Sequence, residues 1–332
     1  MFRKFALTLI SLAVLLSACA PAVTPTAAPA PAPTTAPKAE PTPTSVPPVA
    51  PTTAPADEAI TLIDGLQREV KLEKPAQRII SIAPSNTEIL FAIGAGGQLV
   101  GRDDLSDYPE AAKQIETIGS AFGKLNTEAI VALKPDLILA AEINAPEQVK
   151  TLEDLGLTVY WLANPVDFAG LAENLKIVGA LTGRVAEAEQ LSKSIEARYN
   201  AVIEKVATSS QKPSVFYEID ATDPTKPYTT GPGTFIDKLI DLAGGYNIGQ
   251  ALTDQFAQIS SEELVKIDPE IIVLGDSLYG VTPESVAQRA GWDKLSAVKN
   301  GAVFTFDDNL VSRPGPRLID GLEAFAKLFH PE

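Results

Sequence analysis

The side chains that could perform catalysis or bind a bare metal ion are few. The 332 residues include one histidine, His330, and one cysteine, Cys19. A zinc or copper site needs several histidine or cysteine ligands, and a disulfide needs two cysteines. No Gly-x-Ser-x-Gly elbow occurs, and a Ser/His/Asp triad would have to recruit His330 near the C-terminus. We therefore expect no catalytic residues, no metal ligands and no cofactor.

A different set of residues is suited to binding a large ligand. Aromatic faces suit a flat or hydrophobic chelate, and a guanidinium suits carboxylate or catecholate oxygens. These residues fall in or beside loops at strand ends, where α/β sheets present their binding sites. The predicted ligand-binding residues are Ser85, Asn86, Thr87, Ala121, Phe122, Tyr217, Tyr228, Thr229, Phe256 and Arg313. The alternative is that Tyr217 and Phe256 are ordinary core residues. In that alternative, Arg313 pairs with Asp307 or Asp308.

Two carboxylates occupy equivalent positions in an internal repeat. The segments 126–139 and 260–273 each place a glutamate, Glu128 or Glu262, seven residues before a proline that precedes an apolar run. Each unit is typical of a capped short helix that is stopped by proline and followed by a strand. Two carboxylates on matching helix starts could grip a dimeric partner at two points. The alternative is that each carboxylate only stabilises its helix through the macrodipole, by about 0.3–1 kcal/mol.

The elements that position these residues alternate between strands and helices. Apolar runs predict strands at 78–82, 137–140, 158–162, 215–218, 271–274 and 303–306. With helical periodicity between the strands, this alternation predicts an α/β fold with parallel sheets. Apolar residues recur at helical spacing over 167–207, where Gly183 divides the run into two helices. The second helix, about 24 residues, would extend roughly 36 Å.

The predicted fold class is therefore α/β, with two Rossmann-like lobes joined by a long rigid backbone helix. The predicted boundaries are 57–165 for the N-terminal lobe, 166–208 for the connecting helices and 209–332 for the C-terminal lobe. The internal repeat supports two similar lobes. A stiff connector would allow only modest closure of the lobes on a ligand.

The first 56 residues are predicted to lie outside this fold. Arg3 and Lys4 precede an apolar run that ends at Leu-Ser-Ala-Cys19, which is typical of a secretory signal at 1–19. The ending resembles a bacterial lipobox, whose cysteine is lipidated, and the alternative is an ordinary secreted protein. Residues 20–56 hold 12 Pro, 11 Ala and 8 Thr, which predicts a disordered, solvated tether. We expect a protein anchored through Cys19 outside the cytoplasmic membrane.

The net charge limits the classes of partner. The formal net charge is −15 at pH 7. Repulsion would dominate at nucleic-acid phosphates and at an anionic membrane face. We therefore expect no nucleic-acid partner.

Four segments resemble a known family of receptors. They are RIISIAPSNTE at 78–88, SDYP at 106–109, LKPDLI at 133–138 and SRPGPR at 312–317. Together they resemble the substrate-binding proteins of ABC importers for cobalamin and iron–siderophores, which are bilobed receptors with a helical backbone. The resemblance implies that a metal chelate is captured between two lobes and delivered to a membrane permease dimer driven by a cytoplasmic ATPase. It further implies a lipid-anchored receptor, not an enzyme, in which Glu128 and Glu262 dock on permease arginines. We also expect a monomer.

The sequence departs from the cobalamin-type pattern in the first lobe. Leu105, Ala121 and Ala141 stand where that pattern has aromatic residues. This weakens the case for a corrinoid and leaves both ligand classes open. The remaining alternatives are a receptor for a different, non-metal nutrient and an envelope α/β hydrolase, whose nucleophile and base the sequence does not supply.

Overall fold

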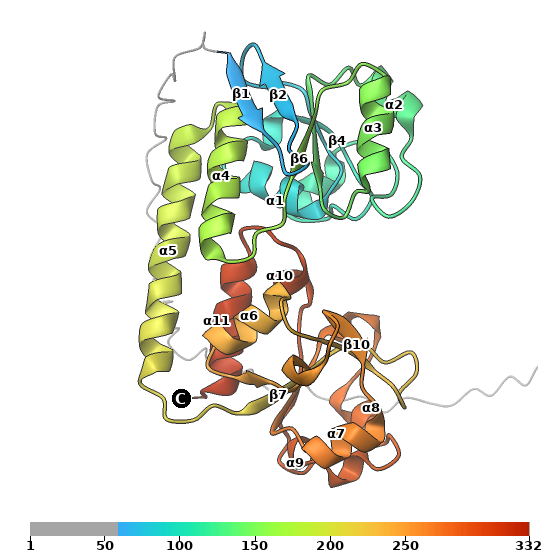
Figure 1. The fold of residues 1–332 in the computed structure, drawn as a ribbon, viewed down its shortest axis with the longest axis vertical. Coiled ribbons are helices and arrows are strands. Elements are labelled where there is room, and N and C mark those ends of the chain that lie inside the picture. Colours follow the sequence, from blue (N-terminus) through green and yellow to red (C-terminus); the bar gives the residue numbers. More distant parts are fainter. Residues whose placement is uncertain (1–58, 332) are drawn as a thin grey trace, which may run out of the picture. The chain divides into compact units, whose positions relative to one another are not determined.

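Two main sheets, a two-stranded hairpin and flanking helices make up residues 59–331, the part of the chain that the computed structural model describes (Figure 1). The predicted signal and tether lie outside this described part. The first sheet has the strand order β4-β3-β5-β6 and is parallel throughout. Its strands are β3 (Ile79–Ser81), β4 (Leu99–Arg102), β5 (Leu137–Ala141) and β6 (Val159–Leu162). The other elements of this lobe are the antiparallel hairpin of β1 (Ile60–Ile63) and β2 (Glu69–Leu72), and the helices α1 (Pro84–Ala92), α2 (Thr127–Ala132) and α3 (Pro146–Asp154).

The second sheet is mixed, which corrects the prediction that both sheets are parallel. Its order is β10-β8-β7-β11-β12, and β9 pairs with β7. The strands β7, β9, β11 and β12 run parallel, whereas β8 and β10 pair in antiparallel fashion. A parallel pair needs a crossover connection of about a dozen residues. The connection between β7 and β8, 221–227, is shorter than that, so these two strands pair in antiparallel fashion. The strands are β7 (Ser214–Asp220), β8 (Tyr228–Thr230), β9 (Tyr246–Asn247), β10 (Phe256–Gln258), β11 (Ile271–Leu274) and β12 (Val303–Thr305).

Four of the described α-helices of the second lobe lie in the connections between its strands, and two follow its last strand, β12. The α-helices are α6 (Phe235–Leu242), α7 (Ser261–Ile267), α8 (Pro283–Ala287), α9 (Ser296–Lys299), α10 (Asn309–Ser312) and α11 (Leu318–Phe329). The 3-10 helices of the described chain are η1 (Gly96–Gln98), η2 (Glu110–Gln114), η3 (Ile248–Ala251), η4 (Gly275–Tyr279) and η5 (Trp292–Lys294).

Two long helices connect the lobes. They are α4 (Phe168–Thr182) and α5 (Val185–Ala207), and α5 coincides with the long helix that the periodicity predicts. Asp167 caps α4 by accepting a hydrogen bond from the Gly170 amide, and Gly183 ends it with a φ of 72° that favours glycine. Gly179 lets the two helices approach closely, because a Cβ at this position would lie 2.7 Å from the Cβ of Ala188.

A continuous apolar core runs from the first lobe through the connecting helices into the second lobe. It includes Leu139 of β5, Val178 of α4, Ile195 of α5, Tyr217 of β7 and Phe325 of α11, all buried. Two further clusters pack other faces of the sheets, one in each lobe. Because the core does not stop at the connector, the connecting helices are packed parts of both lobes.

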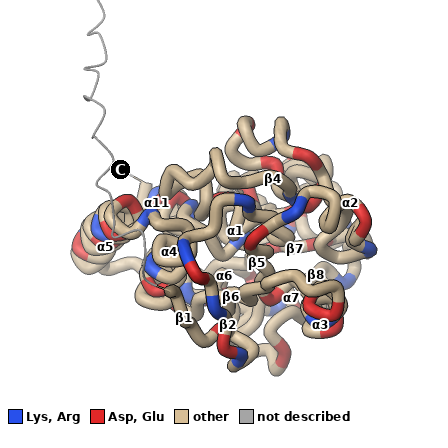
Figure 2. Tube along the Cα trace, turned by 90° about the horizontal axis from the view of Figure 1, so that it is seen from above, with Lys and Arg blue, Asp and Glu red and all other residues tan. Residues whose placement is uncertain are grey.

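The surface of the described part carries both signs of charge. Acidic and basic residues interleave along α5, and α11 carries two acidic residues and one lysine (Figure 2). Side chains of the two helices also form ion pairs with each other. Arg198 of α5 donates from Nε to Glu323 at 2.8 Å and from Nη2 to Asp320 at 2.6 Å. Within residues 59–331, no helix has both the length and the apolar character needed to cross a membrane.

Candidate ligand-binding site

The polar side chains that follow β3 are turned inward. Ser85, Asn86 and Thr87 lie in the first turn of α1, and all three are buried. Asn86 donates from Nδ2 to the Ala140 carbonyl at 3.0 Å. The Thr87 hydroxyl is hydrogen-bonded to the Ser106 hydroxyl at 2.9 Å. These bonds favour a structural role for Asn86 and Thr87, and a ligand contact from this turn stays a prediction.

Four charged side chains meet where α1 and the segment that carries Asp107 approach the segment before α11. Glu88 accepts two hydrogen bonds from Arg317, from Nε at 2.9 Å and from Nη2 at 2.6 Å. Arg313 donates from Nη1 to Asp107 at 2.6 Å and lies 3.5 Å from Glu88. The Arg317 guanidinium also lies over the ring of Tyr108, 3.9 Å from its centroid. We call Glu88, Asp107, Arg313 and Arg317 the interlobe ion cluster, because the first lobe supplies the carboxylates and the second lobe the guanidiniums.

Burial divides this cluster into two unlike pairs. The side chains of Glu88 and Arg317 are 2% and 12% exposed, whereas Asp107 is 52% exposed. Burial raises the pKa of Glu88 and outweighs the opposing effect of the Arg317 and Arg313 charges. Burial also acts to raise the pKa of Asp107, but the hydrogen bond and charge of Arg313 outweigh it, so this pKa is lowered. The Glu88–Arg317 pair is thus a buried, bidentate link, and the Arg313–Asp107 pair is a half-exposed single contact.

The structure corrects one of the alternatives considered for the predicted site. The prediction that Arg313 pairs with Asp307 or Asp308 is wrong, because Arg313 contacts Asp107 and Glu88. Asp308 instead accepts a hydrogen bond from the Tyr217 hydroxyl at 2.6 Å. Tyr217 is fully buried, and burial followed by the charge of Asp308 raises its pKa well above its ordinary value. This favours the core alternative for Tyr217.

Three predicted aromatic residues present their rings to solvent. Phe122 is 76% exposed, Phe256 57% and Tyr228 43%. The alternative that Phe256 is a core residue is therefore wrong. Thr229 and Ala121 are buried, and the Thr229 hydroxyl donates to the Tyr217 carbonyl at 2.7 Å.

The sequence interpretation missed two exposed apolar residues at the carboxyl end of β11. Leu278 and Tyr279 lie at the end of η4 and are 58% and 88% exposed. An aromatic residue a few positions after an apolar strand is the same signal that selected the other loop residues. Tyr279 therefore belongs with the candidates for contact with a flat ligand.

A buried acidic centre lies beside this loop in the second lobe. Glu218 of β7 is fully buried and accepts a hydrogen bond from Arg289 Nη2 at 2.8 Å, and Arg289 lies over the ring of Trp292. Asp276 is 4% exposed, and neither of its carboxylate oxygens has a hydrogen-bonding partner of good geometry in the described residues. Burial first, and then the charge of Glu218, raise the pKa of Asp276 to about 7 against the attraction of Arg289.

Across residues 59–331, no group of three or more His, Cys, Asp or Glu side chains could hold a metal ion.

We expect Asp276→Asn to stabilise the protein in a pH-dependent way. The folded protein holds the Asp276 proton up to a pH of about 7, whereas the unfolded chain releases it near 3.8. The parent therefore loses stability as the pH rises between these two values. Thermal denaturation should give the variant a higher Tm than the parent at pH 8 and a smaller advantage at pH 5.5. An advantage that did not shrink on acidification would contradict a raised pKa.

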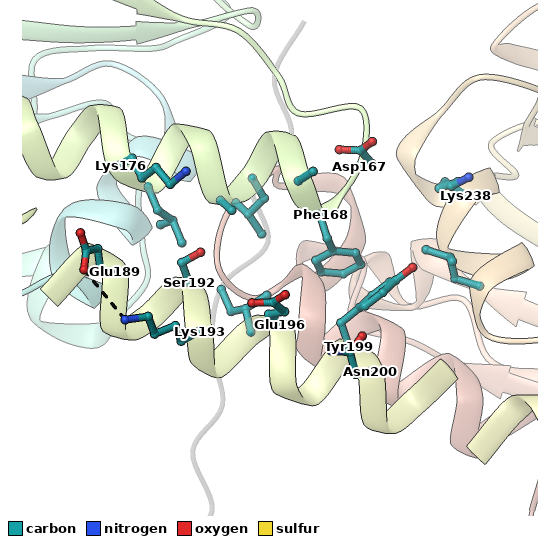
Figure 3. A pocket seen from close by; sticks show the side chains of 16 residues that line it. Asp167, Phe168, Lys176, Glu189, Ser192, Lys193, Glu196, Tyr199, Asn200 and Lys238 are labelled. Carbon is teal, nitrogen blue, oxygen red and sulfur yellow. Dashed lines mark ion pairs between the residues drawn. The ribbon is translucent and has the colours of Figure 1, made fainter. Parts of the chain in front are cut away.

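A hollow of the described part lies away from the strand ends. It has a volume of about 760 Å³ and opens between α4 and α5, with Lys238 and Leu242 of α6 also lining it (Figure 3). The rings of Phe168 and Tyr199 lie 5.1 Å apart within it, and Glu189 pairs with Lys193 at its rim. None of the unpartnered buried polar groups found in the described part lines this hollow. It is a groove beside the connector, separate from the predicted site.

The two repeated carboxylates are exposed at equivalent helix starts. Glu128 lies in the first turn of α2, where Asn126 caps the helix by accepting from the Ala129 amide at 3.0 Å. Glu262 lies in the first turn of α7, which Ser260 caps. Neither Glu128 nor Glu262 has an ion-pair partner among the described residues, whereas the neighbouring Glu263 pairs with Lys266. Capping and pairing are thus supplied by other side chains, which leaves both glutamates available.

Comparison with known proteins finds a matching family model, related sequences and similar solved structures. A family model for periplasmic binding proteins matches residues 79–310. A Bacillus subtilis protein with the name "uncharacterized ABC transporter substrate-binding lipoprotein YvrC" is 35% identical over 280 residues, or 82% of this chain and 86% of that protein. The structure of the vitamin B12 binding protein BtuF of Vibrio cholerae matches with a TM-score of 0.66 and 28% identity, covering 77% of this chain and 97% of that one. The apo form of the heme-binding protein RhuT from Roseiflexus sp. RS-1 matches with a TM-score of 0.68 and 25% identity, covering 77% of this chain and all of that one. These matches confirm the predicted fold class.

Proposed function

Because the chain belongs to the periplasmic binding protein family, we propose that it is the extracytoplasmic receptor of an ABC importer and captures a metal chelate between its two lobes. The observation that carries the proposal is the match over nearly the whole of two receptor structures whose names specify vitamin B12 and heme. In this role the protein is a carrier that performs no catalysis. The family match gives no support to an envelope hydrolase.

The chemistry of the exposed residues supports the proposed ligand class. A cobalamin, a haem or an iron–siderophore presents a large surface that aromatic side chains can cover. Phe122, Tyr228 and Phe256 are exposed aromatic residues of the predicted site, and Tyr279 adds a fourth. Arg313 supplies a guanidinium that could pair with carboxylate or catecholate oxygens of the ligand. Ligand contacts by the predicted residues of both lobes form part of this proposal.

The function is tested by titration calorimetry with ferric siderophores, haem and cyanocobalamin. We expect at least one of these chelates to bind the parent, and Arg313→Ala to weaken binding of an anionic chelate by about 1.5–3 kcal/mol, the usual value of a hydrogen bond to a charged group. Phe256→Ala serves as the companion variant and should cost less unless the ligand is a flat macrocycle. If no chelate of the panel binds and a metal-free nutrient does, the ligand of the receptor is that nutrient and not a chelate. Equal affinities of Arg313→Ala and the parent would remove Arg313 from the site.

The proposed partner is a dimeric membrane permease with its cytoplasmic ATPase. We propose that Glu128 and Glu262 dock the receptor on basic residues of the permease, one contact for each lobe. Their exposure, their equivalent positions in the repeat and their lack of ion-pair partners in the described part support this role. A monomeric receptor would present one such pair to one permease dimer.

We also propose that the receptor is lipid-anchored through Cys19. The support comes from the signal and lipobox pattern of the first 19 residues and from the lipoprotein name of the Bacillus relative. The Pro/Ala/Thr-rich residues 20–56 would then tether the lobes outside the cytoplasmic membrane. Mass spectrometry of the mature N-terminus tests the anchor, and an unmodified N-terminus at another residue would refute it.

A further inference from the structure

Arg313 and Arg317 lie four residues apart on the segment that connects α10 to α11, but their surroundings differ. Both side chains reach across to the first lobe, where they meet one carboxylate of α1 and one of the segment 103–109. The cluster contains two guanidiniums and two carboxylates and is electrically balanced. Any group that replaces one carboxylate must therefore bring its own negative charge to keep that balance.

The Arg317–Glu88 pair cannot be exchanged easily for a ligand. Both Glu88 oxygens accept hydrogen bonds from one planar guanidinium, and both side chains are nearly buried. The Tyr108 ring covers the guanidinium as well. Separating this pair would leave a desolvated charge without a partner, which is strongly unfavourable.

The Arg313–Asp107 pair can be exchanged at little cost. Only one nitrogen of Arg313 contacts Asp107, and that carboxylate is half exposed to water. An ion pair with a half-exposed partner contributes little to stability, because water compensates the carboxylate when it is released. The side chain of Arg313 is 16% exposed, so Asp107 is part of what covers it.

We propose that Asp107 masks the guanidinium of Arg313 in the ligand-free receptor and thereby selects for ligands that carry an anionic group of their own. This inference rests on the proposed function, and it assigns to Asp107 a role as a specificity-determining residue. An anionic chelate displaces the Asp107 carboxylate, takes over its hydrogen bond to Arg313 and leaves the cluster balanced. A neutral chelate of the same shape cannot displace it without leaving Arg313 only its 3.5 Å contact with Glu88, whose oxygens already accept hydrogen bonds from Arg317. Asp107 thus acts as an internal competitor that uncharged analogues do not overcome.

The masking is tested first without any ligand. Phenylglyoxal modifies accessible arginine side chains, and peptide mass spectrometry reports the rate at each residue. We expect Arg313 to be modified several-fold faster in Asp107→Asn than in the parent, whereas Arg317 stays slow in both proteins. Asp104→Asn is the matched control, because Asp104 is an exposed carboxylate on the same segment with no ion pair within the described residues. Equal modification of Arg313 in all three proteins would overturn the proposal.

The selection is tested with a matched pair of ligands. Haem carries two carboxylates that its dimethyl ester lacks, so the two probes differ in charge and share a ring. We expect Asp107→Asn to bind haem about ten-fold more tightly than the parent, a change of about 1.4 kcal/mol. The ester should gain at least as much, because in the parent it must displace Asp107 without replacing its hydrogen bond to Arg313. Asp104→Asn should match the parent with both probes, which separates masking from a general loss of negative charge. Weaker or equal haem binding by Asp107→Asn would overturn the proposal. A parent that binds no chelate of the panel counts against the proposed function, and the modification rates then still decide whether Asp107 masks Arg313.

Discussion

Replacing Arg317 by alanine is expected to lower the free energy of unfolding by about 3–5 kcal/mol, because it leaves Glu88 buried without a partner. Glu88 would then take up a proton more readily, so its pKa would rise further above the ordinary value. A raised folded-state pKa costs stability as the pH increases through it, so the loss should be larger at pH 8 than at pH 5. Urea denaturation followed by circular dichroism at both pH values measures the effect.

Two companion variants make this result specific. Arg313→Ala should cost about 1 kcal/mol or less, because Asp107 is half exposed and Glu88 keeps both of its hydrogen bonds from Arg317. The double variant Glu88→Gln with Arg317→Met should recover much of the stability, since removing both charges of a buried pair is often nearly neutral. An Arg317→Ala protein as stable as the parent at pH 8 would show that the buried link does not hold the lobes together.

Reversing the charge of both repeated glutamates is expected to abolish transport while ligand affinity stays intact. In Glu128→Arg with Glu262→Arg, two attractions to the permease become two repulsions, and truncating one partner of a desolvated interface pair already costs about 2–5 kcal/mol. Uptake and receptor-stimulated ATP hydrolysis should both be lost in proteoliposomes that contain the permease and its ATPase. Calorimetry of the ligand complex and the Tm of the free receptor should match the parent.

The chain offers a closely matched control for this experiment. Glu147 and Glu263 are also exposed glutamates in the first turns of helices, α3 and α7, one in each lobe. Glu147→Arg with Glu263→Arg makes the same change in net charge and removes the same kind of macrodipole interaction, so it should leave transport intact. Full transport by the Glu128/Glu262 variant, or equal loss in the control, would refute the docking assignment.

The fold could be predicted because its signals are local. Continuous apolar runs such as 137–140 and 271–274 are buried on both faces as central strands, and the 3.6-residue periodicity gave α5 to within one residue. The resemblance to ABC substrate-binding proteins, carried by four short motifs, is confirmed by the family match. The mixed second sheet was missed because β8 and β10 are three residues long and carry no apolar run.

The interactions at the site could not be predicted because they connect distant parts of the chain. Glu88 and Arg317 both lie in the quoted motifs, yet 229 positions separate them and only the tertiary fold brings them together. Nothing in the sequence around Asp276 indicates that its carboxylate is buried beside Glu218. Tyr279, in contrast, follows an apolar strand and could have been included by the rule that selected the other loop residues.

The continuous core has a consequence for how ligand binding can be sensed by a partner. An opening motion that exposed about 200 Å² of apolar surface would cost about 5 kcal/mol. Such an open form would make up only about two molecules in ten thousand of the free protein. The free receptor would then spend nearly all of its time in one arrangement of the lobes, and the spacing between Glu128 and Glu262 would be almost the same with and without cargo. A permease would then find the same spacing between the two glutamates in the free and the loaded receptor. It would have to detect the bound ligand through the side chains that surround the ligand.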